Sequence, residues 1–73
     1  MEQEFRIRSY SKLELAILYN PSMSIPSALR TLSRWIAANH RLCEELAMLN
    51  YNPRNRIFTP RQVQAIVTYL GEP

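Results

Sequence analysis

Two stretches of the chain decide its fold: Ser11-Lys-Leu-Glu-Leu-Ala-Ile-Leu-Tyr19 and, after a turn that holds two prolines, Ala28-Leu-Arg-Thr-Leu-Ser-Arg-Trp-Ile36. The apolar residues of the second stretch follow the spacing of one face of an α-helix. They are Ala28, Leu29, Leu32, Trp35 and Ile36. Serines and arginines fall on the opposite face. The sequence therefore predicts two helices joined by a turn, over residues 12–19 and 27–38.

The first of these helices begins with a capping box, because the hydroxyl of Ser11 is followed three residues later by the carboxylate of Glu14. Residues 13 and 15–19 are apolar on nearly all sides of the helix, so we expect it to be the most buried element. Pro26 suits the first turn of the second helix, where its missing N–H costs nothing.

Two further helices follow. Asn39 is a suitable N-cap for a helix over residues 40–49, and Asn50 a suitable left-handed stop. Thr59, Pro60 and Gln62 form a second capping-box start for a helix over residues 60–70, which Gly71 ends. The expected inner faces are Leu42, Leu46 and Leu49 in the third helix, and Val63, Ile66, Val67 and Leu70 in the fourth.

Residues 5–8 alternate between apolar and basic, the period of a half-buried extended segment. We expect this segment to pair with residues 55–58 as a minimal two-stranded ribbon. The predicted fold is thus all-α: a single compact domain over residues 1–73, with four helices in a helix-turn-helix-like arrangement and at most a small ribbon.

The composition excludes several classes of protein. With 73 residues the chain is near the lower limit for a stable core, and its single cysteine excludes an internal disulfide. We expect no metal site, because cysteine and histidine do not cluster, and no cofactor, because one glycine cannot build a phosphate loop. The acidic start and the lack of an apolar run long enough for a bilayer predict a cytoplasmic protein with no membrane partner.

Candidate catalytic groups are also missing. His40 follows an N-cap and stands alone, Cys43 borders an apolar face, and the adjacent Glu44 and Glu45 point about 100° apart on a helix. We therefore expect no enzyme. Trp35 and the tyrosines are interpreted as aromatics of the core or its edge, although Tyr69 lies off the buried stripe of its helix.

The charge pattern points to nucleic acid. The net charge is +3, arginine outnumbers lysine eight to one, and no acid interrupts residues 21–43. Arginine is the better residue for bidentate contacts with phosphate or guanine. We predict double-stranded DNA as the partner, with the helix 27–38 in the groove; the alternative is a solvated face that only keeps the protein soluble. The predicted contacts are Ser27, Arg30, Thr31, Ser33 and Arg34.

A second basic cluster comprises Arg54, Arg56 and Arg61, in the loop 51–58 and at the start of the last helix. An arginine near a helix N-terminus is unfavourable for the helix dipole, by about 0.3–1 kcal/mol, and a bound phosphate there would meet both the helix end and the arginines. We interpret this cluster as a clamp on the DNA backbone. A polar connection without a ligand is the alternative.

Several motifs resemble a known family: Ser9-Tyr-Ser-Lys-Leu-Glu-Leu-Ala16, Arg34-Trp-Ile36, Phe58-Thr-Pro-Arg-Gln-Val63 and Tyr69-Leu-Gly-Glu-Pro73. The family comprises short, uncharacterised proteins of gut Bacteroidetes, catalogued as a domain of unknown function, and implies no activity. A weaker resemblance is to the helix-turn-helix of excisionases and MerR-type regulators, from which this chain differs by a turn about four residues longer.

We therefore predict a small regulatory or accessory DNA-binding protein. The alternative is a protein–protein adaptor or homodimerising module of phage or mobile-element origin that docks through Ala37, Ala38, Met48 and Tyr69.

Overall fold

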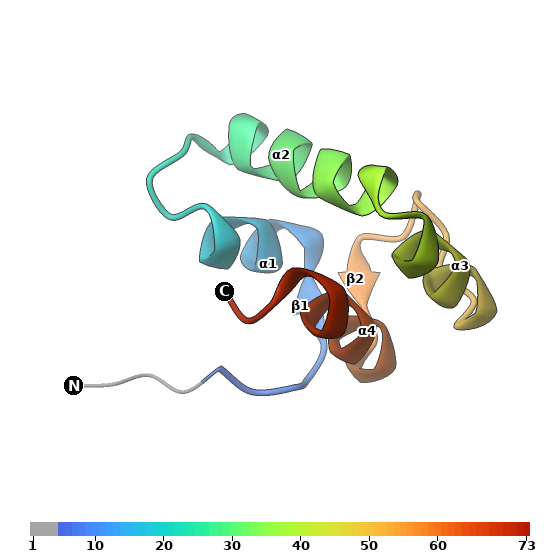
Figure 1. Cartoon of the computed structure of the whole chain (residues 1–73). Coiled ribbons are helices and arrows are strands. Elements are labelled where there is room, and N and C mark those ends of the chain that lie inside the picture. Colours follow the sequence, from blue (N-terminus) through green and yellow to red (C-terminus); the bar gives the residue numbers. More distant parts are fainter. Residues whose placement is uncertain (1–4) are drawn as a thin grey trace.

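The computed structural model describes residues 5–73, which form four helices and a two-stranded ribbon. In chain order the elements are β1 (Tyr10–Ser11), α1 (Lys12–Tyr19), α2 (Ile25–Ala38), α3 (His40–Met48), β2 (Ile57–Phe58) and α4 (Pro60–Leu70). In Figure 1, α2 runs back over α1, α3 stands at one end, and α4 lies on the opposite side of α1 and the ribbon from α2. The predicted small helical domain with a minimal ribbon is confirmed.

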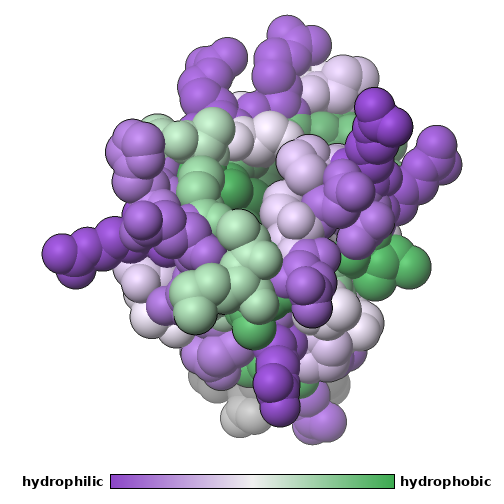
Figure 2. All heavy atoms as spheres, turned by 90° about the vertical axis from the view of Figure 1, so that its right-hand side faces the viewer, coloured by the Kyte–Doolittle hydropathy of each residue, from purple (hydrophilic) through white to green (hydrophobic). Residues whose placement is uncertain are grey.

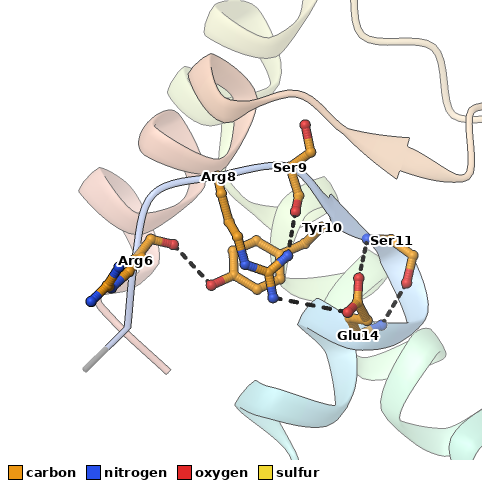
Figure 3. A network of polar contacts seen from close by, with 6 residues as sticks. All are labelled: Arg6, Arg8, Ser9, Tyr10, Ser11 and Glu14. Carbon is orange, nitrogen blue, oxygen red and sulfur yellow. Dashed lines mark hydrogen bonds and ion pairs between the residues drawn. The ribbon is translucent and has the colours of Figure 1, made fainter. Parts of the chain in front are cut away.

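The ribbon forms at a different place from the one predicted. Residues 5–8 are not a strand; the antiparallel pairs are Tyr10 with Phe58 and Ser11 with Ile57. The reason is the register: because Tyr10 pairs with Phe58, residues 5–8 would lie opposite the start of α4, where no strand is present. The Tyr10 hydroxyl instead donates to the Arg6 carbonyl at 2.8 Å (Figure 3). Of the predicted segment 55–58, only its second half pairs.

Helix α1 is not the most buried element, contrary to the prediction. Only Leu15 and Ala16 are buried in it, whereas Leu13, Ile17 and Leu18 remain 39%, 36% and 42% exposed. This helix has only 8 residues and packs against α2 and the ribbon on one side. Part of its surface stays uncovered by residues 5–73, so apolar composition did not translate into burial.

Helix α2 begins at Ile25, earlier than predicted, with Ser24 as N-cap and Pro26 in the first turn. The turn from α1 is therefore confined to residues 20–24. The buried stripe is Ala28, Leu32 and Ile36. Trp35 lies at the edge of the core, 39% exposed, with an edge-on contact to Tyr19 at 6.1 Å between ring centroids.

The remaining helices follow their predicted caps. Asn39 accepts a hydrogen bond from the Leu42 amide at the start of α3, and Asn50 has a left-handed φ of 63° after its end. Helix α4 has the predicted capping box and bounds. The largest fully buried side chains come from four elements and join them in one core: Phe58, Leu15, Leu42, Leu46, Ile66 and Val63.

Candidate nucleic-acid interface

The outer face of α2 is basic and open. Because Ala28, Leu32 and Ile36 fix the inner face, Arg30 and Arg34 must lie on the outside, and both are exposed. They are one helical turn apart, about 6 Å along the axis. Of the other predicted contacts on this helix, Ser27 and Ser33 are exposed, whereas Thr31 is half-buried and its hydroxyl lies 3.5 Å from the sulfur of Met23.

Neither arginine of α2 is neutralised by a described carboxylate. Within residues 5–73 the one ion pair joins Arg8 to Glu14, at 3.9 Å. Arg8 also lies 3.8 Å above the Tyr10 ring (Figure 3). The pKa of Glu14 is lowered chiefly by the backbone N–H of Ser11, which donates to its carboxylate at 2.9 Å. The Glu14 carboxylate thus accepts its hydrogen bond at the start of α1. No ion pair within residues 5–73 involves Arg30 or Arg34, so the outer face of α2 keeps its positive charge.

The basic loop, residues 51–56, is held in a defined turn. Asn52 accepts hydrogen bonds from the backbone amides of Arg54 and Asn55 at 2.9 and 2.8 Å. Lys12 fastens this turn to the start of α1, because its ammonium donates to the Pro53 carbonyl and its backbone amide to the Arg56 carbonyl. The side chains of Arg54 and Arg56 are exposed on a loop whose backbone is tied down at several points.

The basic loop and one edge of α2 are neighbours. Ser33 of α2 and Pro53 of the loop line the same pocket of about 400 Å³, with α3 as its third wall. We call it the α2–α3 pocket. Figure 2, which views the molecule from the side of α3, shows a hollow with a hydrophobic floor, bordered by weakly hydrophobic (pale green) and near-neutral (white) residues. The structure thus places Pro53 of the basic loop beside one edge of the predicted groove helix.

Arg61 belongs to another region. It is exposed in the first turn of α4, and α4 lies across α1 and the ribbon from α2 (Figure 1). Of the predicted clamp, Arg54 and Arg56 thus lie on the loop that precedes β2, and Arg61 lies in the first turn of α4.

The residues of the alternative adaptor face differ in exposure. Met48 is 81% exposed, and Ala37 and Ala38 are also exposed. Tyr69 is half-buried, and its hydroxyl donates to the Glu45 carboxylate at 3.0 Å. This hydrogen bond is the main reason why the pKa of Tyr69 is raised.

Two of the side chains that were rejected as catalytic candidates from the sequence are His40 and Cys43. His40 is exposed, and Cys43 is half-buried with its thiol donating to the Ile36 carbonyl at 3.1 Å. Among residues 5–73, no three or more histidine, cysteine or acidic side chains gather as a metal site would require. None of the helices in this part of the chain combines the length and apolar character needed to cross a bilayer.

Sequence reasoning did not single out Lys12. Its partner Pro53 is 41 positions away along the chain, and no local pattern signals such a contact.

Comparison with known proteins identifies the family of the chain. The family model described as "Domain of unknown function (DUF4248)" matches residues 6–73. The chain belongs to the DUF4248 family. The match spans every helix and both strands, so the α2 face, the basic loop and the α2–α3 pocket all lie within the DUF4248 domain. No curated protein and no solved structure matches the chain.

Proposed function

We propose that this DUF4248 protein is a cytoplasmic regulatory or accessory protein that binds double-stranded DNA through the outer face of α2. The observation that carries the proposal is the pair Arg30 and Arg34, exposed one turn apart with no described carboxylate in ion-pair range. An α-helix fits the major groove, and arginine makes the commonest specific contact there, to guanine.

The neighbouring groups suit phosphate contacts. Ser27 and Ser33 are exposed on the same helix, and hydroxyl groups commonly bind phosphate oxygens. Arg54 and Arg56 are exposed on the basic loop, whose Pro53 lines the same pocket as Ser33, and they would extend the footprint along this loop. We leave Arg61 out of this footprint because α4 lies on the other side of α1 from α2 (Figure 1).

Four arginine contacts predict a distinct salt dependence. The slope of log affinity against log salt should be about −3.6, a loss of roughly a hundredfold between 50 and 200 mM salt. Fluorescence anisotropy with a labelled duplex of mixed sequence measures both quantities. An absence of binding at 50 mM salt would overturn the proposal.

A matched pair of double variants tests the assignment to α2. Arg30→Ala with Arg34→Ala should weaken DNA binding at least about tenfold, with unchanged circular dichroism. Arg41→Ala with Arg61→Ala removes the same charge elsewhere: Arg41 acts on the pKa of Tyr69 in α4, and Arg61 lies in α4 itself. The control should bind at least several-fold more tightly than the α2 variant. Equal weakening would mean that net charge, not the α2 face, binds DNA.

A homodimerising or adaptor module is the second candidate, favoured by the apolar side chains left uncovered by the described chain. They include Leu13, Ile17 and Leu18 of α1, besides Met48 of α3. Light scattering after size-exclusion chromatography tests it: a dimer that persists in high salt, from a protein without affinity for heparin, would favour this function over DNA binding.

A further inference from the structure

The α2–α3 pocket has a mixed lining that suits a small amphipathic molecule. Ile36, Ala37, Leu46 and Ala47 give it apolar walls, and the ring of Tyr51 adds an aromatic surface. Its volume of about 400 Å³ falls within the range of small-molecule sites. Such sites combine mainly apolar walls with a few polar groups that orient the ligand.

Lys12 is the charged group of this lining. An ammonium has three N–H donors, and the one acceptor found for Lys12 is the Pro53 carbonyl. The nitrogen lies 5.2 Å from the centroid of the Tyr51 ring. Within residues 5–73 no carboxylate lies in ion-pair range of Lys12. The cation is held in place by a neutral acceptor and an aromatic face, and residues 5–73 supply no counter-ion for its charge.

We propose that the α2–α3 pocket binds a small organic anion: an apolar, preferably aromatic body with one carboxylate or sulfonate. The body would lie against Ile36, Leu46 and the Tyr51 ring, and the acid group would accept hydrogen bonds from the Lys12 ammonium. None of the arginines of the proposed DNA interface lines this pocket, although Ser33 does, so its occupancy is measured in the absence of DNA.

Two fluorescent probes that differ in charge test the proposal. 8-Anilinonaphthalene-1-sulfonate carries an aromatic body and one sulfonate, whereas N-phenyl-1-naphthylamine has the same body without the acid. We expect the wild-type protein to bind the sulfonate about tenfold more tightly than the neutral probe, as befits a hydrogen bond to a charged group. In Lys12→Met this preference should disappear. Equal affinities for the two probes in the wild type would overturn the assignment of Lys12.

A pair of neighbouring alanines locates the site. Ala37 lines the pocket and Ala38 does not, yet both are exposed on α2. Ala37→Phe should fill the pocket and weaken sulfonate binding by about tenfold or more, whereas Ala38→Phe should leave it within about twofold. Circular dichroism checks that both variants keep their helices. If Ala37→Phe binds the probe as the wild type does, the anion lies elsewhere and the proposal is wrong.

Cys43 supplies an independent readout, because its half-buried thiol also lines the pocket. Saturating 8-anilinonaphthalene-1-sulfonate should slow the alkylation of Cys43 by iodoacetamide in the wild type and in Ala38→Phe. Alkylation at an unchanged rate under saturation would contradict binding in this pocket.

Discussion

Replacement of Gln62 by methionine tests the hydrogen-bonded contact between the end of α3 and the start of α4. Gln62 is 2% exposed, and its side chain serves two chain segments. Its Oε1 accepts a hydrogen bond from the Thr59 amide at 3.0 Å, and its Nε2 donates to the Leu49 carbonyl at 3.1 Å. The first bond completes the cap of α4, and the second joins that cap to the end of α3. Methionine has a similar length but can make neither bond.

The expected loss follows from these two bonds. A net intramolecular hydrogen bond stabilises by about 0.5–1.5 kcal/mol, and a buried group left without a partner costs about 1–3 kcal/mol. Thr59 is exposed, so its amide can turn to water, but Leu49 is half-buried. Gln62→Met should therefore lower the free energy of unfolding by about 2–3 kcal/mol. For a domain of this size that corresponds to a fall in Tm of roughly 10–20 °C.

The same substitution two positions later is the control. Gln64 is exposed, and its side chain donates only to the Thr68 hydroxyl on its own helix, at 3.3 Å. Gln64→Met should change the free energy of unfolding by no more than about 0.5 kcal/mol. Urea titrations followed by circular dichroism at 222 nm compare both variants with the wild type. If Gln62→Met and Gln64→Met lose the same stability, the link from α4 to Leu49 contributes nothing, and the reasoning fails.

Three further predictions concern the core and the pH dependence. Phe58→Ala should lower the free energy of unfolding by about 3–5 kcal/mol, since this ring is 1% exposed in the core. Thermal unfolding should then show that the variant is already largely unfolded at 25 °C. Burial, and to a lesser degree Glu72, raises the pKa of Tyr19 to about 12. The unfolded hydroxyl ionises first, so stability should fall as pH rises from about 10 to 12, and Tyr19→Phe should flatten this fall in urea titrations. Because the pKa of Glu14 is lowered in the folded protein, its carboxylate should stabilise the fold above pH 4.5, and this contribution should be lost as the pH falls further. In acid titrations the free energy of unfolding of Glu14→Gln should therefore fall less steeply with pH than that of the wild type.

The helices were predictable because their signals are local. The Ser11 and Thr59 capping boxes act over three residues, and the stripe on α2 repeats within one helix. The same stripe also predicted that Arg30 and Arg34 face outward, since the inner face of a helix determines its outer face.

Burial of α1 and the place of the ribbon were not predictable in this way. The apolar pattern of α1 is the same whether one side or all sides are covered, and the number of neighbours decides which residues are buried. For the ribbon, the register that pairs Tyr10 with Phe58 leaves residues 5–8 opposite the start of α4, so their alternating pattern has no strand to pair with.

By itself, the sequence determined the four helices, their caps and the positive outer face of α2, because hydrogen bonds and side-chain periodicity within a few residues define them. Only the tertiary structure decided that Lys12 meets Pro53, that the basic loop lies beside α2, that Arg61 lies apart with α4, and that a pocket opens between α2 and α3. These features depend on how separate helices pack against a common core, and contacts between residues far apart in the chain leave no periodic pattern in it.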